Sequence, residues 1–284
     1  MKTNKYLYRV SLMMVFAALC SLSSCGEDDD STEVYKNTKP MRVSKVTQRN
    51  VNLDTNESHN TVFNFVYANN GNLERIIYSG YRDGYYTLSY ESNKVTMKLF
   101  ISNNLYETTT YDLKDGNVLR REDQDQFTHS TYTTLYDYDS NGYLAMEKTY
   151  SSGYERVYSF IWENGNMTKS MEYGNTVGNC TINITYSNIP WPQNFSMYLL
   201  VYSDSDASDL FLHPFGIWGK TPKYLPSKNE IYDEYGNLGF YSCTIDYVMK
   251  EGLISTMQIN SIKEDHHTKY TKYFDIEWEE IPAK

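Results

Sequence analysis

A turn signature that recurs along the chain is the feature that most restricts its fold. Each copy has an aromatic residue, then Asn or Asp with Gly, then an aliphatic residue. Asn and Gly tolerate the positive φ of tight turns, and the flanking residues suit strands. The copies span 67–73, 111–118, 138–144, 162–167 and 232–238, with a copy lacking glycine at 90–95. From 71 to 165 the turn centres recur every 22 to 26 residues, which indicates a repeated two-strand unit.

Between the turns, apolar and polar residues alternate with period two, as half-buried strands do. Tight turns join antiparallel neighbours, so the pattern predicts an all-β, up-and-down meander. About fourteen to sixteen strands are expected, and a flat sheet of that size tends to curl or close. We therefore predict a strongly curved sheet or a closed barrel, built as one domain over 41–282.

Tyrosine dominates the expected inner face, and the chain has 29 of these residues. One predicted apolar face runs through Tyr136 and Tyr138 and continues after the turn through Leu144, Met146, Lys148 and Tyr150. The opposite faces are predicted to carry charges that are costly against lipid. A water-exposed sheet with a Tyr-rich interior is therefore expected rather than a pore. The predicted outward charges are Arg75, Lys98, Glu107, Asp112 and Glu147.

The regular pattern breaks over 188–227, which holds five of the seven prolines. An apolar insertion of this length is expected to fold back across an open end of the sheet. Trp191, Trp218 and Tyr224 lie in it, and Tyr and Trp suit stacking on sugar rings or protein contacts. They are the candidate ligand-binding residues, although packing in the sheet is the alternative for each.

The N-terminus has a basic start, an apolar run of about ten residues and Leu22-Ser-Ser-Cys25, which indicates a secretion signal over 1–24. The arrangement resembles a bacterial lipoprotein signal, which implies that Cys25 carries lipid. Residues 25–40 are acidic and polar, and are predicted to form a flexible tether. The formal charge is −10, and removal of a signal with three basic residues leaves −13, which disfavours nucleic acid as a partner.

Cys180 and Cys243 begin two similar stretches, Cys180-Thr-Ile-Asn-Ile and Cys243-Thr-Ile-Asp-Tyr. An exported protein can form a disulfide, provided that the two Cα atoms come within about 7 Å. Two buried, unpaired thiols are the alternative, and the favoured one.

Catalytic and metal-binding motifs are absent from the sequence, and no cofactor or metal is predicted. Asp204, Asp206 and Asp209 have a spacing similar to a calcium loop but lack its glycine and distal glutamate, so a solvated acidic loop is favoured. Adjacent His266 and His267 are better explained by a polar turn. Strand carboxylates leave open a cryptic glycoside hydrolase, which needs two carboxylates about 5 to 9 Å apart.

Two resemblances add to this interpretation. The Tyr-Asp-x-x-Gly hairpins, above all 136–144, resemble degenerate YD repeats of Rhs-type shell proteins. With the signal, the Asn-Gly hairpins and 215–231, most of 40–282 resembles the uncharacterised DUF4595 family of Bacteroidota lipoproteins. That resemblance implies a porin-like, barrel-type sheet and supplies no catalytic residues. The acidic run after Cys25 resembles the signal that sends such lipoproteins to the outer face of the outer membrane.

The sequence thus predicts a lipid-anchored protein of the outer membrane, facing outward, that binds a glycan or a protein partner without catalysis. The insertion 188–227 and nearby turns are the expected contact surface. An envelope structural or assembly role is the first alternative, and a carboxylate-dependent glycoside hydrolase is the second.

Overall fold

The computed structural model describes residues 40–80, 83–174, 179–192, 195, 219–238, 242–262 and 268–282. All of them belong to one compact unit that spans 37–284. The predicted signal peptide, Cys25 and the tether up to residue 39 lie outside the described residues.

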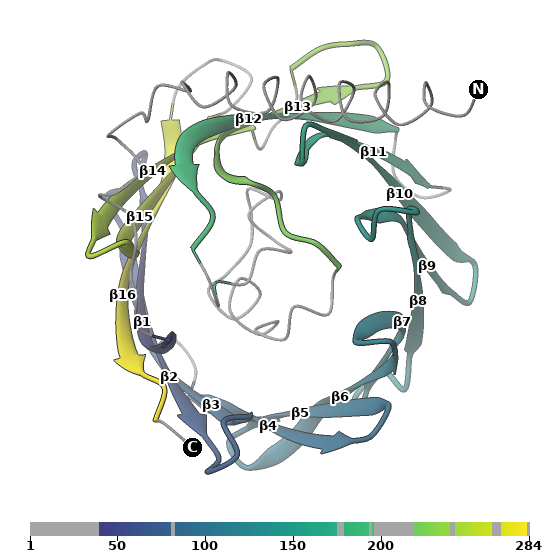
Figure 1. Cartoon of the computed structure of the whole chain (residues 1–284), viewed down its shortest axis with the longest axis vertical. Coiled ribbons are helices and arrows are strands. Elements are labelled where there is room, and N and C mark those ends of the chain that lie inside the picture. Colours follow the sequence, from purple (N-terminus) through teal and green to yellow (C-terminus); the bar gives the residue numbers. More distant parts are fainter. Residues whose placement is uncertain are drawn as a thin grey trace, which may run out of the picture. The chain divides into compact units, whose positions relative to one another are not determined.

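The described residues form sixteen β-strands in one closed antiparallel barrel, in which each strand pairs with its neighbours in sequence (Figure 1). This confirms the predicted all-β meander and selects the closed form. Within this part of the chain, no helix is long and apolar enough to cross a membrane. The strands are β1 (Met41–Asn52), β2 (Ser58–Tyr67), β3 (Leu73–Ser79), β4 (Gly84–Glu91), β5 (Lys94–Ile101), β6 (Asn104–Lys114), β7 (Asn117–Asp125), β8 (Thr131–Tyr138), β9 (Leu144–Ser151), β10 (Tyr154–Glu163), β11 (Asn166–Gly174), β12 (Cys180–Pro190), β13 (Tyr224–Asp233), β14 (Ser242–Lys250), β15 (Leu253–Ile262) and β16 (Thr268–Glu280).

Closure depends on the pairing of the first strand with the last. β1 pairs with β16 from Met41↔Glu280 to Asn52↔Tyr270. This pairing leaves no strand edge with unsatisfied backbone groups, which explains why so long a meander closes on itself.

The predicted turn glycines adopt the conformation that the signature requires. Asp115 and Gly116 have φ of 52° and 86°, and Asn164 and Gly165 have 52° and 82°, as two-residue hairpin turns need. A longer turn type closes 139–143, where Asp139 Oδ1 accepts hydrogen bonds from the backbone N–H groups of Asn141 and Tyr143. The sequence signature therefore encodes real hairpins of two kinds.

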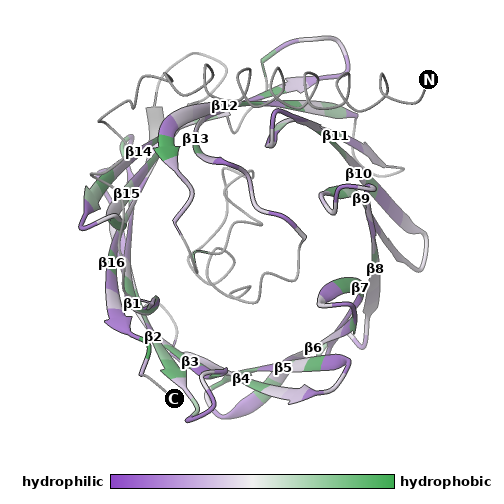
Figure 2. Cartoon of the chain, in the orientation of Figure 1, coloured by the Kyte–Doolittle hydropathy of each residue, from purple (hydrophilic) through white to green (hydrophobic). Residues whose placement is uncertain are grey.

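Apolar and polar residues alternate along the strands, as the green and purple bands of Figure 2 show. The buried apolar side chains point into the barrel and form one core, while others such as Ile77 and Leu135 are exposed on the outward faces. Its most completely buried members come from strands all around the barrel: Val46, Ile76, Val118, Leu225, Ile254 and Phe274.

A β-bulge after each of several hairpins shifts this alternation by one residue. In β9, Leu144 pairs with Tyr138 but Met146 pairs with Asp137, so the register slips between them. The prediction that Met146, Lys148 and Tyr150 continue the face of Leu144 is therefore wrong. Glu147 takes the inward position instead, because one inserted residue exchanges the two faces of a strand.

Aromatic side chains reinforce one end of the barrel, where even-numbered strands end and odd-numbered strands begin. At this end, the backbone pairing between an odd strand and the next even strand stops early. An aromatic residue on the even strand then donates a side-chain hydrogen bond of 2.7–2.9 Å to a backbone carbonyl of the odd strand. We call this end the aromatic rim and the opposite end the far rim. The donor–acceptor pairs are Tyr67–Val43, Tyr90–Leu73, Tyr138–Val118, Trp162–Leu144, Tyr186–Met167, Tyr247–Pro226 and Trp278–Ile254.

The positions of these pairs are invariant. In each pair, the donor lies three residues after the residue of its strand that is paired nearest to the aromatic rim. The acceptor lies two residues before the partner of that residue on the neighbouring strand. In β7 and β8, for example, Arg120 and Leu135 are the last pair, and Tyr138 donates to Val118. β5 and β6 differ, because their backbone pairing continues toward the rim as far as Lys94↔Asp112. Leu113 stands there in place of the aromatic donor. Most of the repeat's aromatic residues thus satisfy carbonyl groups that the sheet leaves unpaired.

Candidate ligand site in the barrel interior

The inward faces of β6 to β11 carry most of the barrel's buried charge. Two rows of side chains cross these strands at neighbouring levels. The row nearer the far rim contains Arg121, Thr134, Thr149 and Arg156. The row one level deeper contains Tyr136, Glu147, Tyr158, Glu172 and Cys180.

The first group of charges lies on β6 and β7. Arg121 Nε donates to Asp123 Oδ1 at 2.8 Å. Thr109 Oγ1 lies 2.7 Å from Asp123 Oδ1 and 3.0 Å from Glu107 Oε1, and its single proton can serve only one of them. Burial, and then the nearby Asp123 carboxylate, raise the pKa of Glu107. The predicted outward position of Glu107 is therefore wrong, whereas Arg75, Lys98 and Asp112 do lie on outward faces.

The second group lies on β10 to β12. Arg156 Nε donates to Glu172 Oε1 at 2.5 Å, and Cys180 Sγ lies 3.3 Å from Glu172 Oε2. Glu172 is almost fully buried, at 8% side-chain exposure, whereas the Arg156 side chain is 35% exposed. The ion pair therefore joins a buried carboxylate to a guanidinium that still meets the lumen.

Glu147 lies between these two ion pairs. It is 8% exposed, and its Oε2 atom has no hydrogen-bond partner among the described residues. Burial raises the pKa of Glu147 to about 7, although Arg121 and Arg156 act in the opposite direction. A buried carboxyl group with an unpaired oxygen is costly, so this position favours the protonated form or an added partner.

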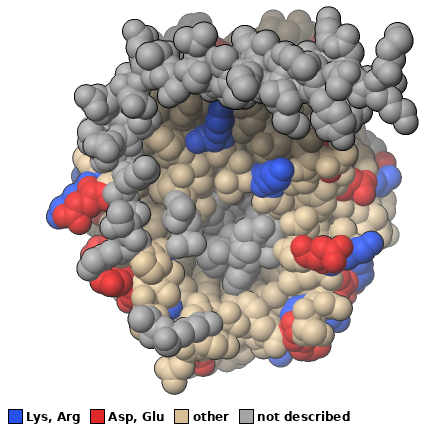
Figure 3. All heavy atoms as spheres, in the orientation of Figure 1, with Lys and Arg blue, Asp and Glu red and all other residues tan. Residues whose placement is uncertain are grey.

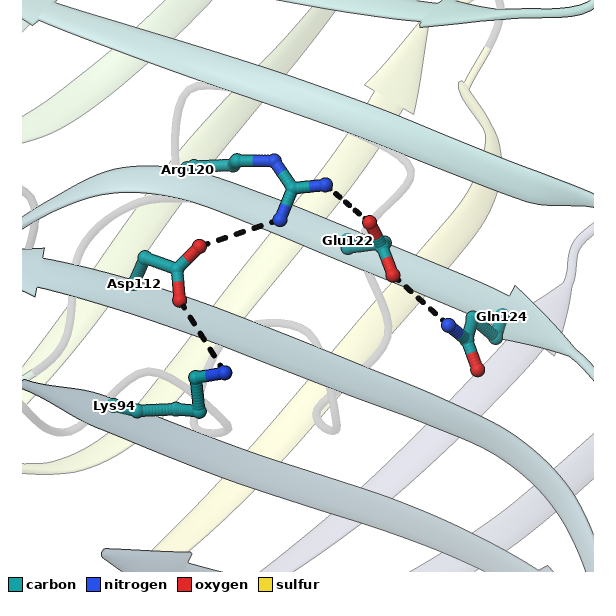
Figure 4. Close-up of polar contacts among 5 residues, drawn as sticks. All are labelled: Lys94, Asp112, Arg120, Glu122 and Gln124. Carbon is teal, nitrogen blue, oxygen red and sulfur yellow. Dashed lines mark hydrogen bonds and ion pairs between the residues drawn. The ribbon is translucent and has the colours of Figure 1, made fainter. Parts of the chain in front are cut away.

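The outward faces are different, because their charges form exposed chains of ion pairs. Figure 4 shows Lys94, Asp112, Arg120 and Glu122 in line across β5, β6 and β7, where Arg120 bridges Asp112 and Glu122. Acidic and basic groups also lie side by side around the outer margin of the barrel in Figure 3. The outer wall is therefore mixed in charge, and it also exposes apolar side chains such as Ile77, Leu135 and Ile161.

The described ends of the insertion attach to the aromatic rim. Lys220 N donates to Gly142 O, and Lys223 N donates to Gly165 O, so the segment is fixed to two hairpin turns. In Figure 1 the described residues 219–223 run inside the ring of strands. β12 extends to Pro190 and β13 begins at Tyr224, so both strands enter the predicted insertion.

Of the three aromatic candidates, two can be located. Trp191 is partly buried, and its Nε1 donates to Phe195 O at 3.0 Å. The Phe195 ring in turn packs against Trp278, with centroids 6.3 Å apart. Tyr224 opens β13 opposite Pro190, and its backbone N–H donates to Asn166 Oδ1. Trp191 thus contributes to the packing of the aromatic rim, and a binding role for either residue stays a prediction.

Both thiols are free in the structure. Cys180 pairs with Asp233 on β13, whereas Cys243 pairs with Asn229 on the opposite side of that strand. One whole strand and a four-residue offset along it separate the cysteines, which is well beyond disulfide reach. The disulfide considered from the sequence is not made, and burial raises the pKa of each thiol to about 12.

The remaining sequence candidates lie outside the described residues. These are Cys25, Trp218, the acidic group Asp204, Asp206 and Asp209, and the pair His266 and His267. Within the described part of the chain, no group of three or more His, Cys, Asp or Glu side chains could hold a metal ion.

The sequence analysis did not identify the charged residues inside the barrel as a site, although a signal for them exists. We call these residues the luminal cluster: Arg121, Asp123, Glu147, Arg156 and Glu172. Arg156 interrupts a face that otherwise reads Tyr154, Tyr158, Phe160 and Trp162, so one charge stands among inward aromatic residues. A lone charge on such a face calls for a buried partner. The partner, Glu172, is on the next strand and only the register shows it.

The barrel is similar in fold to a solved structure. A crystal structure of a porin-like protein from Bacteroides uniformis superposes with a TM-score of 0.63 at 15% identity, over 84% of this chain and 98% of that one. No family model matches the sequence, so the resemblance to the DUF4595 family stays a prediction. No curated protein matches it either. The likeness establishes that the two proteins share a porin-like barrel fold.

Proposed function

We propose that this chain is a lipid-anchored barrel of the cell envelope whose wall faces water, and that it binds a glycan or a protein partner without catalysis. The observation that supports this most directly is the chain of charges on the outward faces of β5 to β7. Further outward ion pairs, such as Lys45–Glu277 and Lys148–Glu155, extend the same character around the barrel.

These charges are poorly suited to lipid. An Arg or Lys on the lipid face costs about 2–4 kcal/mol near the bilayer midplane, and several such residues occupy strand centres here. A membrane-spanning barrel would instead turn an uninterrupted apolar belt outward. A water-facing barrel needs a separate attachment to the membrane, and the predicted lipid on Cys25 supplies it.

Both described ends of the chain lie at one end of the barrel. β1 begins at the aromatic rim, and Ile281 N donates to Pro40 O there, so both described ends of the chain leave the barrel at that end. A tether from Cys25 would reach the barrel from the aromatic rim.

The attachment is tested by metabolic labelling with a radioactive fatty acid and by detergent phase partitioning of the full chain. The wild-type protein is expected to incorporate label and enter the detergent phase. Cys25→Ser is expected to lose both properties, whereas the control Cys180→Ser retains them. If Cys25→Ser remained in membranes after an alkaline carbonate wash, the barrel itself would be embedded and the proposal would be wrong.

The binding role is tested on a glycan array with the full-length protein and its Trp191→Ala and Trp218→Ala variants. Saturable binding that either variant loses would assign the contact surface to the insertion. If no glycan binds, crosslinking in the intact envelope should capture a protein partner. If neither experiment yields a partner, the binding role is refuted and the structural or assembly role takes its place.

One observation favours a second candidate, a glycoside hydrolase. Glu147 and Glu172 share one row with Tyr158 between them, and the pKa of Glu147 is raised to about 7 while Glu172 pairs with Arg156. Such enzymes require two carboxyl groups, one of them an acid with a raised pKa. Release of reducing ends from polysaccharides, abolished by Glu172→Gln, would favour this candidate over simple binding.

A further inference from the structure

We propose that the polar half of the lumen, reached from the far rim, is a binding site for a neutral saccharide. This inference rests on the proposed binding function and assigns it a site and a ligand class. The site consists of Arg121, Glu147 and Arg156, with Tyr132 and Tyr154 nearer the far rim.

Exposure varies along this part of the barrel interior, and the Asp123 side chain, level with Tyr132, is only 16% exposed. Tyr132, on the inward face near the far rim, is 41% exposed. One level deeper, the Arg156 side chain is 35% exposed and that of Arg121 is 28% exposed. At the next level Glu147 is only 8% exposed. We call the part of the interior bordered by these side chains, from Tyr132 down to the buried Glu147, the recess.

The recess offers unused hydrogen-bonding groups of both kinds. Arg121 and Arg156 each donate to a carboxylate through Nε alone, which leaves their terminal nitrogens without a hydrogen-bond partner among the described residues, although the Arg156 guanidinium also lies over the Tyr158 ring. Glu147 Oε2 is buried and likewise unpaired within that part of the chain. Sugar hydroxyl groups accept from guanidinium and donate to carboxyl oxygens, so one ligand of this class can satisfy all three.

The charge balance selects a neutral ligand over an ion. The guanidinium groups of Arg121 and Arg156 are matched by the carboxylates of Asp123 and Glu172. An acidic ligand would meet those two carboxylates and Glu147, and a cation would meet the two guanidinium groups. A neutral polyol gains charge-assisted hydrogen bonds from both without a net electrostatic cost.

Aromatic rings provide the remaining element of a sugar site. Tyr132 and Tyr154 contact edge to face, with centroids 6.1 Å apart, on the inward side near the far rim. Beneath the charged rows the lumen is apolar, with Phe160 and Val118 buried. The exposed Tyr132 ring, held by the partly buried Tyr154, suits the apolar face of a pyranose ring, and the polar groups beneath it suit the hydroxyl groups.

The test is calorimetric titration of the full-length protein with neutral gluco-, galacto-, manno- and xylo-oligosaccharides, and with an oligogalacturonate as the acidic comparison. Tyr132→Ala and Glu147→Met each remove a group from the recess, and both are expected to weaken binding at least tenfold. Tyr150→Ala is the matched control, because Tyr150 is 40% exposed on the outward face of the adjacent strand. It should bind like the wild type.

The outcomes separate this inference from the proposed function. Binding that survives Tyr132→Ala and Glu147→Met but is lost in Trp191→Ala would overturn the luminal site and leave the insertion as the glycan site. Preference for the oligogalacturonate would overturn the neutral ligand class. If none of these sugars binds, the luminal site is refuted, whereas a protein partner found by crosslinking would still support the proposed function.

Discussion

Substitution of Glu147 by Gln tests the buried carboxyl group at the centre of the luminal cluster. The groups around it are Arg121 and Asp123 on β7, Tyr136 on β8, and Arg156 and Tyr158 on β10. Burial raises the pKa of Glu147 from 4.5 to about 7 in the folded protein. Because the folded state binds this proton more tightly than the unfolded state, the carboxyl group stabilises the fold fully below pH 4.5. That stabilisation is lost as the pH rises through 7.

The magnitude follows from the two pKa values. At 1.36 kcal/mol per pKa unit, the difference between 4.5 and about 7 is worth about 3 kcal/mol in full. About 2 to 3 kcal/mol of this should disappear between pH 5 and pH 8. Gln cannot ionise and keeps the shape of the protonated acid, so Glu147→Gln should stabilise the protein relative to wild type by about that amount at pH 8 and by far less at pH 5.

The assay is urea unfolding of wild type and Glu147→Gln at pH 5, 6, 7 and 8, followed by tryptophan fluorescence. Glu163→Gln, at an exposed position on β10, is the control and should leave the pH dependence unchanged. If the difference between Glu147→Gln and wild type were the same at pH 5 and pH 8, Glu147 would titrate normally. The reasoning from burial, and the protonated group at the base of the recess, would then be wrong.

Three further predictions concern the frame of the barrel. Tyr138→Phe removes the hydrogen bond to the Val118 carbonyl and should lower the free energy of unfolding in urea by about 1 kcal/mol. Tyr235→Phe, at an 81% exposed position, should lower it by almost nothing. Equal losses in the two variants would refute a stabilising role for the rim hydrogen bond. Gly219→Ala would place a Cβ 2.5 Å from Gly142 O at a positive φ, whereas Gly116→Ala has the same φ strain but open space around the Cβ. In urea unfolding, Gly116→Ala should cost about 1 kcal/mol and Gly219→Ala clearly more. A smaller loss of stability for Gly219→Ala would contradict the packing of the insertion. Cys180 and Cys243 should resist alkylation at pH 8 in the folded protein, because burial raises the pKa of both thiols to about 12. Both should react after unfolding without reductant, as measured by mass spectrometry of their peptides. A disulfide-linked pair of these peptides would contradict the prediction.

Most of the fold could be predicted because its signals are local. Turn glycines such as Gly116 and Gly165 have the positive φ that the Asn-Gly and Asp-Gly pairs indicate. Alternation in β8 and β10 placed Tyr136, Tyr158 and Phe160 on inward faces, as predicted. Each of these signals depends on residues within one hairpin, so one sequence suffices to recognise it.

The candidate site could not be predicted for a specific reason. Strict alternation from Leu144 placed Glu147 outward, and a single bulge residue placed it inward. Bulges depend on how two strands pair, and the residues of one strand do not encode them alone. The partners of the luminal charges are likewise set by register between strands, as with Arg156 and Glu172.

The sequence by itself determined the hairpin repeat, the antiparallel order of strands and the predominance of inward tyrosines, because each follows from turn chemistry and period-two alternation. Only the tertiary structure decided that β1 closes onto β16, that aromatic side chains satisfy the carbonyl groups at one rim, and that Glu147 lies between two ion pairs inside the lumen. These features depend on contacts between residues far apart in the chain, and the register of a closed barrel fixes those contacts only when every strand is in place.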